Sequence, residues 1–127
     1  MPTRIRITSG TISVDAELND SPTAPAIRRS LPIDARASIW GDEIYFTIPV
    51  EIAVEPDARA EVEVGELGYW PTGNAFCLFF DPTPASTSDK PVAASPVNIL
   101  GKVLGDATVF RSARNGDRVR IEAADGG

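Results

Sequence analysis

Residues 33–48 read IDARASIWGDEIYFTI, in which apolar and polar residues alternate on both sides of Gly41-Asp42. A period of two places successive side chains on opposite faces of a β-strand. A two-residue turn at Gly41-Asp42 would set Ile39 opposite Ile44 on one face and Trp40 opposite Glu43 on the other. The stretch therefore predicts a hairpin with an aliphatic face toward the core and an aromatic and acidic face outward.

The N-terminal residues carry a second hairpin pattern. Isoleucines and a valine alternate with polar residues on either side of Ser9-Gly10. A turn at these two residues would pair Ile7 with Ile12 in the apolar row and Arg4 with Asp15 in the polar row.

The rest of the chain predicts one short helix and several more strands. The segment Asp20-Ser21-Pro22 indicates the start of the helix, and Pro32 its end. The 75–80 strand is apolar on both faces, so we expect it in the centre of a sheet, covered on each side. Residues 107–114 fit a short strand or a helical turn. Strands are predicted over residues 60–64, 67–70, 75–80, 97–104 and 118–123, separated by turns.

The composition is that of a single β-rich domain. A chain of 127 residues suits one domain over residues 1–127. Val and Ile together number 21 against 6 Leu, a balance that favours sheet over helix. About eight short, mostly antiparallel strands with one or two short helices predict a mainly β fold, either a closed β-barrel or a sandwich. Side chains fill the interior of a barrel of that size, so a functional site would lie on the outer wall or in a rim loop.

The composition also excludes several kinds of chemistry. The chain contains no histidine, so a Ser-His-Asp triad and a His-ligated metal are both impossible within it. The single cysteine, Cys77, lies in an apolar run and is interpreted as a core residue. We therefore predict no catalytic residue, no metal site and no cofactor.

The charge and hydropathy of the chain exclude two kinds of partner. With 12 basic and 18 acidic residues, the net charge of −6 has the wrong sign for binding phosphate backbones, so we expect no nucleic acid partner. No apolar run is long enough to cross a membrane, and we expect a cytoplasmic protein with no membrane partner.

Residues 81–96 are the one long segment without a strand pattern. They contain four prolines and three serines, and Val92 is their only large apolar residue. Loops of this length in compact domains are usually functional or disordered. The segment is interpreted either as a wall that faces a ligand or as a passive surface loop.

Four motifs carry a resemblance to a known family: residues 40–46 (WGDEIYF), 68–73 (GYWPTG), 79–86 (FFDPTPAS) and 95–101 (SPVNILG). In this order they resemble the cyclophilin-like domain family of small bacterial and archaeal proteins. The resemblance implies a closed cyclophilin-like β-barrel, in a family whose biochemical role is unassigned. Asp81 departs from the family, in which glycine is more common at that place.

True cyclophilins are a different group. Their isomerase site uses a Phe-His-Arg segment and a Gln-Gly-Gly-Asp segment, and neither has a counterpart in this chain. A similar fold does not by itself transfer the activity.

The first functional hypothesis is a non-catalytic module that binds a small molecule or a peptide. Aromatic residues on the outer wall would supply apolar contact, and polar residues near the 81–96 loop would supply hydrogen bonds. The aromatic residues could instead pack as core beneath the helix and the long loop. The candidate ligand-binding residues are Trp40, Glu43, Tyr45, Tyr69, Trp70, Phe79, Thr83, Ser86 and Asn98.

Two alternatives stay open at this point. One is an enzyme similar to peptidyl-prolyl isomerases. Its mechanism would not depend on histidine, and an arginine would donate a hydrogen bond to the amide nitrogen. The other is a subunit of a homo-oligomer, such as a homodimer, that buries an exposed aromatic patch.

Overall fold

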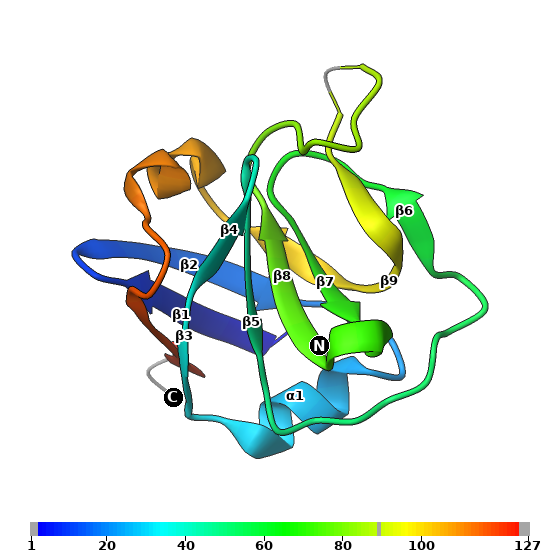
Figure 1. Ribbon diagram of the computed structural model, residues 1–127. Helices are drawn as coiled ribbons and strands as arrows, with labels where there is room; N and C mark the ends of the chain where they lie inside the picture. The colour runs from blue at the N-terminus through cyan, green and yellow to red at the C-terminus, as the bar shows by residue number, and fades with distance from the viewer. Residues whose placement is uncertain (1–2, 89, 125–127) are drawn as a thin grey trace.

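The structure is a computed structural model that describes residues 3–88 and 90–124. These residues form ten strands, one α-helix and two short 3-10 helices (Figure 1). The helices are α1 (Ala24–Ser30), η1 (Pro71–Gly73) and η2 (Ala107–Ser112). The strands are β1 (Thr3–Ser9), β2 (Ile12–Leu18), β3 (Ile33–Arg36), β4 (Ser38–Trp40), β5 (Glu43–Thr47), β6 (Arg59–Glu61), β7 (Glu66–Trp70), β8 (Ala75–Phe79), β9 (Val92–Val103) and β10 (Arg118–Ala123).

Every strand pairing among the described residues is antiparallel, as expected from the sequence. The strand order is β3-β10-β1-β2-β9-β7-β8-β5-β4, and β6 pairs with β9 beside this path. Helix α1 lies at one end of the sheet, and the chain that follows β8 projects at the other end (Figure 1).

The sheet is not closed into a barrel by hydrogen bonds, so the prediction of a closed barrel is not confirmed. Strands β3 and β4 stand at the two ends of the order and follow each other in the chain, with only Ala37 between them. β3 pairs with β10 and β4 pairs with β5. β3 and β4 therefore each pair with one neighbouring strand only. No ladder of hydrogen bonds joins β3 to β4, so the sheet stays open there.

The hairpin predicted at residues 33–48 forms with the predicted register only near its turn, over residues 38–45, because residues 33–36 pair with β10 instead. Trp40 lies opposite Glu43 and Ile39 opposite Ile44, on either side of the turn at Gly41. The N-terminal hairpin also forms, but its turn lies one residue further along the chain, at Gly10-Thr11.

The predicted register of that N-terminal hairpin is wrong by two residues. Ile7 pairs with Val14 in place of Ile12, and the ion pair to Asp15 comes from Arg6 at 3.0 Å. The reason is Gly10, whose φ of 58° suits the first position of a two-residue turn. A shift of two residues keeps every side chain on its predicted face.

Helix α1 begins later than the sequence predicts and ends as predicted. Its N-cap is Thr23, not a residue of the 20–22 segment, and Pro25 falls in its first turn. The Thr23 hydroxyl makes no capping bond because it donates to the Glu55 carboxylate and accepts from Asn98 Nδ2 at 3.0 Å. The chain turns extended at Leu31, just before Pro32.

Of the predicted 81–96 loop, residues 81–88, 90 and 91 contain no helix or strand, and residue 89 lies outside the described residues. Residues 92–96 form the first part of β9 and pair with β6, where Glu61 lies opposite Val92. Proline and serine in this stretch hid the strand, since proline is tolerated where a ladder is irregular, and the β6 and β9 register shifts here. Residues 107–112, which fitted two structures, form η2 after Asp106, whose carboxylate accepts from Thr108 N at 3.0 Å.

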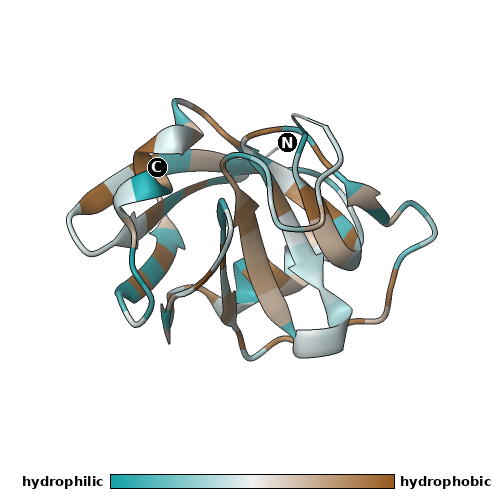
Figure 2. Cartoon of the chain, turned by 45° about the horizontal axis from the view of Figure 1, so that its top comes forward, coloured by the Kyte–Doolittle hydropathy of each residue, from teal (hydrophilic) through white to brown (hydrophobic). Residues whose placement is uncertain are grey.

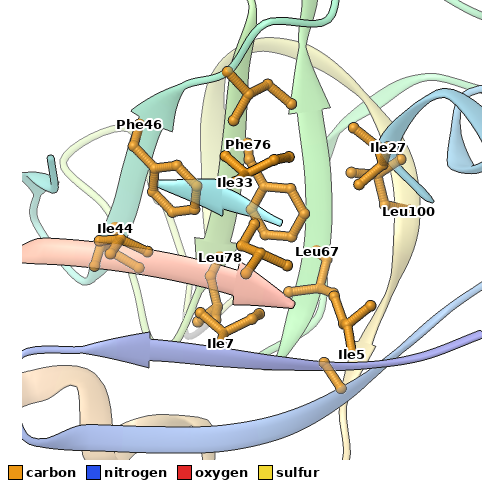
Figure 3. Packing of buried hydrophobic residues seen from close by; sticks show 14 of the residues in the cluster. Ile5, Ile7, Ile27, Ile33, Ile44, Phe46, Leu67, Phe76, Leu78 and Leu100 are labelled. Atoms are coloured by element: carbon orange, nitrogen blue, oxygen red, sulfur yellow. The ribbon is translucent and has the colours of Figure 1, made fainter. Parts of the chain in front are cut away.

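One large hydrophobic cluster fills the space enclosed by the curved sheet and α1. Figure 3 shows Ile5 and Ile7 of β1 directed toward the same space as Leu67 and Leu78. The rings of Phe46 and Phe76 stack there, with centroids 5.4 Å apart. We call this group the main core.

A second hydrophobic cluster lies on the opposite, outer face of β5, β8 and β7. β8 supplies both clusters because its side chains alternate: Phe76 and Leu78 enter the main core, and Ala75, Cys77 and Phe79 enter the second cluster. Its central, doubly covered position is thus confirmed. Figure 2 shows the hydrophobic colour continuous along this strand, and alternating with hydrophilic colour on others. The second cluster contains Val62, Ala75, Cys77, Phe79, Ala93 and Val97, with Tyr45, Trp70 and Ile99 packed against it.

Candidate functional site

A pocket of about 190 Å³ opens over the second cluster. Its lining is mostly apolar and includes three aromatic side chains and one carboxyl group. We call it the aromatic pocket. Its lining residues are Trp40, Glu43, Tyr45, Trp70, Ala93, Ala94 and Val97.

The strand register brings the polar and aromatic lining residues together. Trp40 of β4 lies directly opposite Glu43 of β5, and Tyr45 follows two residues later on the same face. Tyr45 is paired with Cys77 of β8, which in turn is paired with Gly68 of β7. The hairpin at 33–48 therefore builds one side of the pocket by alternation alone.

Two aromatic rings meet nearly at right angles in the pocket. The ring centroids of Tyr45 and Trp70 are 6.4 Å apart and their planes make an angle of 78°. The Trp70 indole Nε1 donates to Ser95 Oγ at 2.5 Å, which ties β7 to the first part of β9. This bond fixes the orientation of one pocket wall.

Gly68 makes room for the facing wall. A Cβ at this position would come within 2.8 Å of Val97 Cγ2. The absence of a side chain on β7 thus lets Val97 of β9 pack down against the sheet, beside Phe79.

Glu43 is the only charged residue among the described residues that line the pocket. It is 5% exposed, and burial raises its pKa from 4.5 to about 7, with a hydrogen bond from the Cys77 thiol acting in the opposite direction. No lysine or arginine lines the pocket with it. A buried carboxyl without a cationic partner is costly in its charged form.

Cys77 lies under Glu43 in the second cluster and is a core residue, as predicted. Burial raises the pKa of its thiol well above the usual value, and the nearby carboxylate raises it further. A protonated, buried thiol is a poor nucleophile.

The turn of the 33–48 hairpin is locked against the segment between β8 and β9. Asp42 N donates to Pro82 O at 3.1 Å, and Asp42 O accepts from Phe80 N at 2.9 Å. Gly41 has a φ of 58°, and a Cβ there would lie 2.5 Å from Pro84 Cδ. This close approach holds the segment beside Trp40 and Glu43.

Thr83 and Ser86 make hydrogen bonds within the same segment. The Thr83 hydroxyl donates to Val92 O at the start of β9, and Thr83 N donates to Ser86 Oγ at 2.9 Å. Both residues lie outside the pocket lining, so the structure gives them a positioning contact instead of a place at the pocket wall.

Tyr69 and Asn98 lie on the other face of the sheet, in the interior. Both are fully buried. The Tyr69 hydroxyl donates to Val50 O at 2.6 Å and accepts from Ile52 N at 3.1 Å. Asn98 Oδ1 accepts from Glu55 N at 2.7 Å. Together these two residues hold the 50–55 segment against the sheet.

Replacing Tyr69 with phenylalanine is expected to lower the free energy of unfolding by about 1–3 kcal/mol, because it leaves buried backbone groups of the 48–52 segment without a partner. Tyr45→Phe is the matched control, since it removes the hydroxyl of a half-buried tyrosine, and we expect a change within about 0.5 kcal/mol. Denaturant unfolding of both variants measures the difference. Equal stability of the two variants would contradict the role assigned to the Tyr69 hydroxyl.

Of the predicted residues, Trp40, Glu43, Tyr45 and Trp70 therefore line one pocket, and Phe79 lies in the cluster beneath it. Sequence reasoning missed Ala93, Ala94 and Val97. The two alanines fell in a segment interpreted as a loop, and small apolar residues carry no chemical signal of their own. Once β9 is known to begin at Val92, residues 93 and 97 are an even number of positions apart on one strand, which places them on the same face.

No three side chains of the kinds that bind metals come together in the described part of the chain. No helix of residues 3–88 and 90–124 has the length and apolar character needed to span a bilayer.

The fold agrees with comparisons to known proteins. The family model described as Cyclophilin-like matches residues 3–122, so the chain belongs to the cyclophilin-like family. It is similar to the solution structure of a hypothetical protein from Archaeoglobus fulgidus, with 36% sequence identity and a TM-score of 0.81 over 97% of this chain and 95% of that one. No curated protein matches the chain significantly.

Proposed function

We propose that this protein is a binding module that holds a small molecule, or one side chain of a peptide, in the aromatic pocket. The observation that carries the proposal is a concave apolar surface with three aromatic side chains and one carboxyl group at a single place. Pockets of mainly apolar lining with a few polar groups are the usual form of small-ligand sites.

The rigidity of the pocket supports the proposal. Trp70 is fixed by Ser95, and the turn at Asp42 is fixed by the backbone at residues 80–82. A site whose walls are held in place before binding loses little conformational entropy when a ligand enters.

The isomerase alternative has less support from the same residues. It requires a donor aimed at the nitrogen of a prolyl peptide bond, and no arginine is among the described residues that line the pocket. The Trp70 indole N–H is already bonded to Ser95. Catalysed cis/trans exchange of Xaa-Pro peptides, above the uncatalysed rate, would restore that alternative.

Filling the pocket tests the binding function directly. Ala94 is exposed and lines the pocket, so Ala94→Phe places a ring in the space a ligand would use. Ala123→Phe is the matched control on β10, because Ala123 is also exposed on a strand and lies outside the pocket. We expect Ala94→Phe to reduce the affinity for pocket-binding fragments by about tenfold or more, and the control to leave it unchanged.

Nuclear magnetic resonance titration with a soluble fragment library measures these affinities. Both tryptophans of the chain line the pocket, so their two indole Nε1–H signals report binding there. Fragments that shift the indole signals equally in wild type and Ala94→Phe, or no fragment that shifts them at all, would contradict the proposal. The molar mass in solution tests the homodimer alternative, which predicts a dimer that buries the aromatic pocket.

A further inference from the structure

The aromatic pocket combines two features that a purely apolar ligand would leave unmatched. Its lining includes the aromatic side chains of Trp40, Tyr45 and Trp70, and the one charged group among its described lining residues is the almost fully buried Glu43. The electron-rich faces of aromatic rings attract cations, and a desolvated carboxylate does so more strongly. The two features therefore favour the same kind of ligand.

The strand register brings these groups together. Trp40 is the cross-strand partner of Glu43, and Tyr45 lies next to Glu43 on the same face of β5. The ring of Trp70 stands nearly perpendicular to that of Tyr45. Three aromatic side chains and one carboxyl group thus line the same small pocket.

The remaining lining indicates which cations suit the pocket. A primary ammonium group carries three N–H donors that each need an acceptor when buried. Apart from the Glu43 carboxylate and the Tyr45 hydroxyl, the side chains of the described lining residues offer such a group no acceptor. An ammonium group whose nitrogen carries alkyl groups in place of hydrogens has no such need.

We propose that the aromatic pocket binds the alkylated ammonium group of a small organic cation, with the rings of Trp40, Tyr45 and Trp70 against its alkyl groups and the Glu43 carboxylate as its counter-charge. This inference rests on the proposed binding function and names its ligand class. The net charge of −6 on the whole chain attracts such cations from solution.

The ionisation of Glu43 gives the proposal a second, independent signature. Burial raises the pKa of Glu43 to about 7, and a bound cation stabilises the charged form. Cation affinity should therefore increase as the pH rises through 7, whereas the affinity for a neutral ligand of the same shape should not. The Cys77 thiol beneath Glu43 stays protonated in this range because burial raises its pKa.

The test compares choline with its uncharged carbon analogue, 3,3-dimethylbutan-1-ol, by titration of the two indole signals. In the wild-type protein at about pH 8 we expect choline to bind about tenfold more tightly than the alcohol, and less of this preference at about pH 5.5. Glu43→Gln should remove the preference. Glu51→Gln makes the same change in net charge at an exposed residue outside the pocket, and it should keep the preference.

Three results would overturn the proposal. They are equal affinity for the two probes in the wild type, an unchanged preference in Glu43→Gln, and no binding of choline. The first two would leave the proposed binding function standing, because the pocket would still bind a probe. With no choline binding, the fragment titration of wild type and Ala94→Phe decides separately whether the pocket binds anything.

Discussion

Gly101→Ala is expected to lower the free energy of unfolding by at least about 3 kcal/mol, a large share of the total for a domain of this size. Gly101 has a φ of 152°, and a Cβ at this position would lie 1.8 Å from Glu17 O. The obstructing atom belongs to the backbone of β2, so no rotation of a side chain can relieve the overlap. β9 pairs at this residue with both β2 and β7, and moving it disturbs both pairings.

Denaturant unfolding followed by circular dichroism measures this effect. Gly105→Ala is the matched control, because no atom lies within 4 Å of a Cβ there. We expect the control to change stability by no more than about 0.5 kcal/mol. A Gly101→Ala variant as stable as Gly105→Ala would show that β9 does not approach β2 as closely as described.

Glu43→Gln is expected to stabilise the protein, but only at pH values above the ordinary carboxyl pKa of 4.5. The pKa of Glu43 in the folded state is about 7, above the ordinary value of 4.5. A carboxyl group with a raised pKa contributes stability that is complete below pH 4.5 and is lost as the pH rises to about 7. At 1.36 kcal/mol per pKa unit this loss is about 3 kcal/mol, and the glutamine variant avoids it.

The variant should therefore be more stable than the wild type by up to about 3 kcal/mol at pH 8, and about equal to it at pH 4. Unfolding at the two pH values, with Glu51→Gln as the exposed control, measures the difference. A stabilisation of the same size at both pH values would show that the effect does not come from ionisation of Glu43.

The alternation of apolar and polar residues was sufficient to predict most of the strands. It gave the register of the hairpin around Gly41, because the two-residue turn was placed correctly at Gly41-Asp42. It gave the limits of β10, which match the 118–123 prediction. It also identified β8 as a central strand from its two apolar faces.

Alternation does not determine turn position or long-range pairing. The N-terminal hairpin could shift by two residues without moving any side chain to the other face, so the sequence pattern does not distinguish the two registers. The open ladder at Ala37 depends on how β10 and β5 share the 33–40 segment. The first part of β9 exists because β6 pairs with it, a contact between distant segments.

The candidate site shows the same division between local and long-range information. Trp40, Glu43 and Tyr45 were predicted to share a face because they lie on one hairpin. Tyr69 and Trp70 are neighbours on β7 and must point to opposite faces, so at most one of them could line the pocket. Which of the two does so depends on how the strand packs in the sheet.

Both tryptophans of this protein stand in the aromatic pocket and none in the main core. Its intrinsic fluorescence emission consequently reports on one small region of the surface, without any attached dye. Unfolding can be followed both by tryptophan emission and by circular dichroism. A transition that appears earlier in emission would show that the aromatic pocket unfolds before the main core.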